Sequence, residues 1–97
     1  MPTVIQGNFE WDADKNASNS EKHGIWFEDA VVVFAQIHYL SPSLRHESGE
    51  VRFFAVGIWE TKEITVFFTW RGERRRIISA RRARHEEREI YRDFTGA

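Results

Sequence analysis

The sequence predicts an α+β fold, in which an antiparallel sheet of about four strands packs with two N-terminal helices and one C-terminal helix. Three observations lead to this prediction. Apolar residues first recur at helical spacing, then alternate with a period of two from about residue 37 to residue 79, and finally return to helical spacing. The connections between the alternating runs are short, which is typical of antiparallel hairpins. With 97 residues, 41% hydrophobic and 14% aromatic, the chain has the size and composition of one packed domain covering residues 1–97.

The N-terminal part is expected to hold one short strand and two helices. Alternation in NFEWD predicts a strand over residues 8–12. Asp12 is a suitable N-cap for a helix over residues 13–23, and Gly24 is a suitable stop signal. This first helix has little apolar face, so we expect it to lie on the surface. The second helix is predicted from the i, i+3, i+4, i+7 spacing of Phe27, Ala30, Val31 and Phe34.

Strands and turns fill the middle of the chain, and a helix ends it. The predicted strands cover residues 37–40, 51–59, 64–70 and 75–79. A polar loop over residues 41–50 separates the first two of them, and turns at 60–63 and 71–74 separate the others. The final helix is predicted over residues 80–94, where one helical face carries Ala83, Glu87, Ile90, Tyr91 and Phe94.

Composition argues against several classes of protein. The chain has no cysteine, which excludes a disulfide framework and a thiolate metal site. His38, His46 and His85 lack the i, i+4 spacing of a helical zinc motif, so we expect neither a metal nor another cofactor. No stretch approaches the roughly 18 apolar residues of a membrane span. The first residues also lack the order of charged and apolar residues found in a signal peptide, so we expect a cytoplasmic protein.

Charge is distributed unevenly along the chain. The formal net charge of the whole chain is −1, but residues 1–70 carry a net −5 and residues 71–97 a net +4. All nine basic residues after residue 70 are arginines, the side chain preferred where a planar fork must hold phosphate or carboxylate. This pattern argues against broad binding of nucleic acid and favours a local phosphate site.

The segment RRRIISAR, residues 74–81, is the centre of this basic region. Strict alternation places Arg75, Ile77, Ser79 and Arg81 on one face of a strand and Arg74, Arg76, Ile78 and Ala80 on the other. The alternative interpretation is an edge strand protected by charge, with Arg74 and Arg75 as turn and edge charges. Arg52, Arg71, Arg76 and Arg81 all lie near strand ends, which an antiparallel meander can bring to one patch. Most of the run from Arg82 to Arg92 is expected to be a solvated helix face.

Three residues are candidates for proton transfer. Lys22 and His23 end the first helix, where the alternative role is a pair of cations favoured by the helix dipole. Glu50 lies in the polar loop with Glu47, and its alternative role is an ion pair with Arg52.

Over about residues 9–92, the chain resembles the BrnT ribonuclease toxins of bacterial type II toxin–antitoxin systems. The segments that carry this resemblance are FEWDADKNASNSEKHGIWFEDAVVVF, GEVRFFAVG and RRRIISARRARHEEREIY. The matching positions are Trp11-Asp12, Asn19, Lys22-His23-Gly24, Phe27-Glu28, Ala30, Glu50, Arg52, Gly57, Arg76, Ile78-Ser79-Ala80-Arg81, a glutamate at 86 or 87, and Tyr91. The chain departs from the family at Trp26, where a small hydroxyl residue is usual. That change removes a helix cap worth about 1 kcal/mol.

The resemblance implies a RelE-like fold, cleavage of RNA and growth arrest. It also implies neutralisation by a BrnA-like antitoxin with a ribbon-helix-helix domain, through which alone the toxin would reach operator DNA. For metal-independent cleavage, our candidates are Arg52, Arg76 and Arg81 for phosphate binding, Lys22, His23 and Glu50 for proton transfer, and Arg71, Ser79 and Trp70 for RNA contacts.

Two other functions remain open from the sequence. In the first, the chain is a non-catalytic module whose arginines only dock an acidic segment of a ribbon-helix-helix partner. In the second, it is a DNA-binding regulator acting alone, which the acidic first part and the absence of a helix-turn-helix pattern disfavour.

Overall fold

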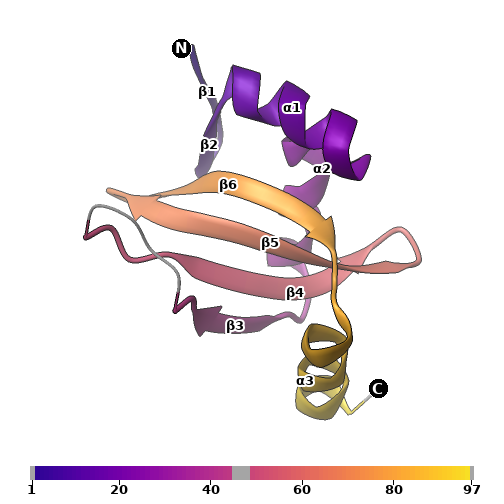
Figure 1. Cartoon of the computed structure of the whole chain (residues 1–97). Coiled ribbons are helices and arrows are strands. Elements are labelled where there is room, and N and C mark those ends of the chain that lie inside the picture. Colours follow the sequence, from indigo (N-terminus) through magenta and orange to yellow (C-terminus); the bar gives the residue numbers. More distant parts are fainter. Residues whose placement is uncertain (1, 45–48, 97) are drawn as a thin grey trace.

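A computed structural model describes residues 2–44 and 49–96 of the chain, so part of the predicted polar loop, with His46 and Glu47, lies outside the described residues. The described part has an α+β fold with three α-helices, one 3-10 helix and a six-stranded sheet (Figure 1). The elements are β1 (Thr3–Gln6), β2 (Phe9–Asp12), α1 (Ala13–His23), α2 (Phe27–Ala30), the 3-10 helix η1 (Val31–Ala35), β3 (Tyr39–Pro42), β4 (Phe53–Trp59), β5 (Lys62–Arg71), β6 (Arg74–Arg82) and α3 (His85–Thr95).

The sheet is larger than predicted, and it is mixed rather than antiparallel. Its strand order is β1-β2-β6-β5-β4-β3, and β2 pairs with β6 in parallel. The prediction of about four antiparallel strands is therefore wrong in these details. Strand β1 has four exposed residues and so gives no alternating signal. The β2–β6 pairing joins residues more than sixty positions apart, which local periodicity does not encode.

The two faces of the sheet carry different helices. On one face, α2 and η1 cover the main core, whose largest buried side chains include Trp11, Phe27 and Phe68, while α1 contributes no residue to that core. On the other face, α3 covers a smaller cluster of Val56, Ala83 and Tyr91. Figure 1 shows α1 beside β6, α2 behind the strands and α3 at the bottom of the view. Because α3 is short, it leaves part of its face of the sheet open.

Helix α1 has the boundaries that the sequence predicts. Asp12 Oδ1 accepts hydrogen bonds from the backbone N–H groups of Asp14 and Lys15, at 2.8 and 3.1 Å, and Gly24 adopts the left-handed conformation at the other end. The pKa of the Asp12 carboxyl is lowered mainly by these hydrogen bonds, with the one from Lys15 the largest cause. The helix lies on the surface, as expected, but its two buried residues are Asn16 and Asn19.

These two asparagines connect α1 to the rest of the protein. Asn19 Nδ2 donates to the carbonyl oxygens of Ala80 and Ile25, at 2.9 and 3.0 Å, and its Oδ1 accepts from the N–H of Ala80 at 3.1 Å. Asn16 accepts from the N–H of Phe27 and donates to Glu28, both at 2.7 Å. The side-chain amide of Asn19 thus takes the place of a neighbouring strand at Ala80, since β2 pairs with β6 only as far as Ile77.

A register shift in β6 changes which of its side chains share a face. Ser79 pairs with Phe67 but Ile77 pairs with Phe68, so Ile78 is an extra residue in a bulge. Residues paired across strands share a face, so Ile77 and Ala80 face the core while Ile78, Ser79, Arg76 and Arg81 face the other side. The predicted strict alternation over residues 74–81 is therefore wrong beyond Ile77. Strand β6 also lies inside the sheet, so it is not the charged edge strand of the alternative interpretation.

Two predicted helices differ from the structure. The single helix predicted from Phe27 to Phe34 is one turn of α-helix followed by η1, and its N-cap Trp26 makes no side-chain cap hydrogen bond. The final helix begins at His85 rather than residue 80, because β6 continues its pairing with β5 as far as Arg82. Within residues 2–44 and 49–96, no helix combines the length and apolar character required to cross a bilayer.

We predict that Asn19→Ala lowers the free energy of unfolding by about 3 kcal/mol, because it leaves buried backbone groups of Ala80 and Ile25 without partners. Urea unfolding monitored by circular dichroism measures this change. The matched control is Asn8→Ala, at an exposed position, which we expect to stay within about 0.5 kcal/mol of the wild type. Equal stability of the two variants would contradict the role given to Asn19.

Candidate functional site

An open cleft lies on the sheet face that α3 leaves partly uncovered. Its volume is about 850 Å³, which is in the range of small-molecule sites. From residues 2–44 and 49–96, the cleft combines aromatic side chains with three arginines, one histidine and one glutamate. Its lining consists of His23, Tyr39, Ser41, Pro42, Ser43, Leu44, Arg52, Phe54, Phe67, Ile78, Ser79, Arg81, Arg84, Glu87 and Ile90.

Four of the predicted site residues meet in this cleft, and a fifth lies beside it. His23 comes from the end of α1, Arg52 from the segment before β4, and Ser79 and Arg81 from β6. A smaller hollow of about 190 Å³ adjoins the cleft, shares His23, Ile78 and Ser79 with it, and is lined by Lys22. As far as the described residues define the lining, it does not include Glu50, Trp70, Arg71 or Arg76.

The Asn19 hydrogen bonds and the β6 bulge are what bring these residues together. Asn19 holds the last turn of α1 against Ala80, the residue between Ser79 and Arg81. The bulge turns Ser79 and Arg81 away from the core toward the cleft. His23 therefore lies beside Ser79 although the two residues are far apart in the sequence.

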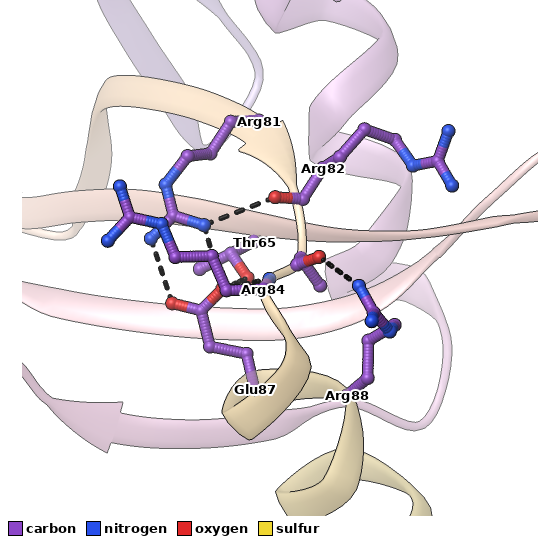
Figure 2. A network of polar contacts seen from close by, with 7 residues as sticks. Thr65, Arg81, Arg82, Arg84, Glu87 and Arg88 are labelled. Atoms are coloured by element: carbon purple, nitrogen blue, oxygen red, sulfur yellow. Dashed lines mark hydrogen bonds and ion pairs between the residues drawn. The ribbon is translucent and has the colours of Figure 1, made fainter.

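Arg81 is held by a network centred on Glu87 (Figure 2). Its two terminal nitrogens donate to the two carboxylate oxygens of Glu87, at 2.7 and 2.8 Å, in the bidentate geometry that guanidinium favours. Glu87 also accepts from Thr65 Oγ1 at 2.9 Å and from the N–H of Arg84 at 2.7 Å. The network thus fixes the start of α3 to β5 and β6, and it fixes the orientation of the Arg81 guanidinium.

This network also determines the charge of Glu87. Burial raises the pKa of the Glu87 carboxyl, but the hydrogen bonds from Arg81, Arg84 and Thr65 and the charge of Arg81 together outweigh burial. The pKa of Glu87 is therefore lowered from its ordinary value, and the carboxylate stays ionised at neutral pH. Of the two glutamates, 86 and 87, that the family motif leaves open, Glu87 is the one with this structural role.

Arg52 is less firmly paired than Arg81. Its nearest carboxylate oxygen belongs to Glu50, 4.0 Å from Nε, and this buried Nε has no hydrogen-bond partner among the described residues. Glu50 instead makes a closer ion pair, at 2.9 Å, with Arg71. Glu50, which lies outside the cleft lining, is therefore the counterion of Arg71 and a more distant one of Arg52.

Arg76 shares a sheet face with Arg81 but lies farther along β6. Its guanidinium donates to Glu10 on β2 at 2.6 Å, and both side chains are mostly buried. Arg76 pairs with Thr69 and Arg81 pairs with Thr65, so the two arginines are separated by four residues of β5, or about 13 Å. The Arg76–Glu10 pair strengthens the parallel contact between β2 and β6.

Trp70 and Arg75 lie on the opposite face of the sheet from the cleft. The Arg75 guanidinium lies over the rings of Phe34 and Trp70, at 4.6 and 4.7 Å from their centroids. Burial lowers the pKa of Arg75 from its ordinary value. Arg75 is therefore a packed residue of an internal strand, and the prediction of a turn or edge charge at this position is wrong.

Sequence reasoning missed several residues of the cleft. Phe54 and Phe67 were assigned only to strands, since alternation does not show which face of a sheet stays open. Glu87 was expected at the solvated start of the last helix because it lies in a run of charges, and its pairing with Arg81 of β6 leaves no local pattern. Within the described part of the chain, no three His, Asp or Glu side chains lie close enough together to hold a metal ion.

Comparison with known proteins gives one match that covers most of the chain. A family model described as the ribonuclease toxin BrnT of type II toxin–antitoxin systems matches residues 11–87. This range runs from Trp11 in β2 to Glu87 in α3 and includes every polar residue of the cleft. A comparison with curated proteins gave no significant match.

We predict that the stability contributed by the Glu87 charge is lost in acid. Because the folded-state pKa of Glu87 is lowered, its carboxylate stabilises the fold above the ordinary value of 4.5, and this stabilisation falls as pH drops through the folded-state pKa. The free-energy advantage of wild type over Glu87→Gln should therefore shrink below about pH 4.5. Urea unfolding of both proteins at a series of pH values measures this difference in the free energy of unfolding.

The control for this experiment is Glu86→Gln, which removes an exposed carboxylate from the same turn of α3 and so corrects for the loss of one negative charge. If the advantage of wild type over Glu87→Gln were the same at neutral and at acid pH, the Glu87 charge would not hold this network.

Proposed function

Because this chain belongs to the BrnT family of ribonuclease toxins of type II toxin–antitoxin systems, we propose that it is a metal-independent endoribonuclease with its active site in the cleft between α1 and α3. The observation that carries this proposal is the meeting of His23, Ser79, Arg52 and Arg81 in one cleft. These side chains combine a group able to transfer protons with cations able to hold a phosphate.

The proposed reaction needs no covalent enzyme intermediate. A base removes the proton of a ribose 2′-hydroxyl, and the 2′-oxygen forms a bond to the adjacent phosphorus. The bond from phosphorus to the 5′-oxygen of the next nucleotide breaks, and an acid supplies a proton to that oxygen. The products are a 2′,3′-cyclic phosphate and a 5′-hydroxyl end, so the reaction requires a base, an acid and positive charge at the phosphate.

Arg52 and Arg81 are the proposed phosphate ligands. The bidentate contact with Glu87 holds the Arg81 guanidinium in place before substrate binds, which lowers the cost of ordering it. Arg52 lines the cleft, and its ion pair with Glu50 is long, at 4.0 Å, so its guanidinium is less committed to a protein partner than that of Arg81. Ser79 adds a hydroxyl donor on the same strand as Arg81. Arg76, which is held by Glu10, would contact a neighbouring phosphate of a longer RNA.

His23 and Lys22 are the proposed proton-transfer residues. His23 lines both the cleft and the adjoining hollow, and Lys22 lines the hollow. An imidazole accepts and donates protons close to neutral pH. Glu50, which the sequence offered as a third candidate, is proposed only as a counterion, because Arg71 holds its carboxylate.

In this proposal the cations of the cleft supply the charge that a metal ion supplies in other nucleases. The free enzyme would act in the cytoplasm and arrest growth. A BrnA-like antitoxin with a ribbon-helix-helix domain would neutralise it, and the complex would bind operator DNA through the antitoxin alone. The non-catalytic alternative accounts for the arginines, but it gives no reason for a histidine beside Ser79 and Arg81.

The arginine assignment predicts that Arg81→Ala and Arg52→Ala each lower the rate of RNA cleavage about 100-fold, because each removes charge stabilisation at the reacting phosphate. The measurement is the single-turnover rate on a defined RNA in EDTA, with both new ends mapped. The matched control is Arg82→Ala, an exposed residue of the same strand outside the cleft lining, which should keep wild-type activity.

Arg76→Ala should retain more activity than either cleft variant, since Arg76 lies outside the lining. Wild-type activity that vanished in EDTA would rule out the metal-independent route. Full activity of both cleft variants would rule out the arginine assignment.

The proton-transfer assignment predicts that His23→Ala lowers the same rate about 100-fold without unfolding the protein, because His23 is exposed. The matched control is His85→Ala, an exposed histidine at the start of α3 that pairs with Glu89 and does not line the cleft. Equal rates for the two histidine variants would show that His23 does not transfer a proton in the slow step.

A further inference from the structure

The floor of the cleft is aromatic. Phe54 on β4 and Phe67 on β5 are directly paired across the two strands, and their ring centroids are 6.1 Å apart. Tyr39 on β3 continues the row, with its ring centroid 6.2 Å from that of Phe54. All three side chains are half-buried and line the cleft.

Phe67 has no place in the hydrophobic core of the described residues. The main core lies on the opposite face of the sheet, and the cluster under α3 includes Tyr39 and Phe54 but not Phe67. The ring contacts of Phe67 are instead with Phe54 and with the guanidinium of Arg81, which lies 5.2 Å from the ring centroid. A partly exposed phenylalanine in the centre of a sheet, beside a cation, is available to a ligand.

We infer that Phe67, supported by Phe54, stacks on an unpaired base of the RNA, and that the substrate of the proposed ribonuclease is therefore single-stranded at the cleavage site. This inference rests on the proposed function and adds to it the form of the substrate. Every nucleobase has an aromatic face that such a floor accepts, and its phosphate can at the same time contact an arginine. The position of Arg81 over Phe67 places these two contacts within one nucleotide of each other.

The arrangement of charge favours a nucleic acid over a protein segment as the occupant. The aromatic floor is bordered by three arginines, Arg52, Arg81 and Arg84. Glu87, the one carboxylate that the described residues contribute to the lining, is already paired with Arg81. An aromatic floor inside a cationic rim is the combination by which proteins bind single strands without reading their sequence. A double helix keeps its bases stacked inside and cannot offer one to this floor.

The test measures binding separately from cleavage. The probes are short single-stranded 2′-O-methyl RNA oligomers, which lack the attacking hydroxyl and stay intact, and an abasic oligomer of the same length. Fluorescence anisotropy gives the dissociation constants for the wild type and for Phe67→Leu, which keeps an apolar side chain but loses the ring. Phe67→Tyr keeps the ring, and Phe53→Leu removes a ring from the opposite face of β4 as the matched control.

We expect the wild type and Phe67→Tyr to bind the base-containing oligomer about tenfold more tightly than the abasic one. Phe67→Leu should bind both about equally, while Phe53→Leu should behave like the wild type. Annealing the oligomer to its complement should abolish the preference.

Equal affinity of the wild type for the two oligomers would overturn the inference without the need for any variant. So would a Phe67→Leu variant that keeps the tenfold preference, because the base would then stack elsewhere. Failure of the proposed function appears separately, as intact unmodified RNA in the cleavage assay.

Discussion

The side-chain amide of Asn19 is the contact on which the functional side of this protein depends. Strand β2 leaves β6 after Ile77 and its chain turns into α1, which would leave the backbone of Ala80 without a neighbour. Asn19 satisfies both backbone groups of Ala80 and also the carbonyl of Ile25. A buried amide is well suited to this position because it offers a donor and an acceptor side by side, as a strand does. The helix is thereby fixed by polar contacts, and its last turn brings His23 to Ser79.

The second constraint is the placement of so many arginines on a small sheet. A partly buried guanidinium is costly unless a carboxylate or an aromatic ring accompanies it. Arg76 has Glu10, Arg81 has Glu87, and Arg75 lies over Trp70 and Phe34, while the exposed Arg71 pairs with Glu50. The basic stretch is thus divided into residues that hold strands together and residues that face the cleft. Arg81 does both, because the contact with Glu87 that anchors α3 also orients its guanidinium.

Local features of the fold were predictable from the sequence, and long-range features were not. Helix α1 was predicted to the residue, because Asp12 and Gly24 are strong local signals, and the hairpins of β4, β5 and β6 were predicted because short turns connect them. The parallel pairing of β2 with β6 and the exposed strand β1 were missed, since neither leaves a local pattern. The same limit applies to the cleft. His23, Arg52, Ser79 and Arg81 were named from the sequence and do meet, whereas Glu50, Trp70 and Arg71 were named with them and lie outside its lining.

The bulge at Ile78 resolves a conflict that the sequence of β6 contains. Ile77 pairs with Phe68 and belongs to the core, so an unbroken strand would turn Ser79 and Arg81 toward the core as well. Burying a hydroxyl and a guanidinium there, without partners, would cost several kcal/mol. One extra residue shifts the alternation, so that Ala80 returns to the core while Ser79 and Arg81 reach the open face. The same shift brings Ile78 and Ser79 to one side, where Ile78 lines both hollows and Ser79 meets His23. Strict alternation of side chains therefore describes β6 only as far as Ile77. The residues that follow the bulge, together with Ile78, contribute the β6 part of the cleft lining.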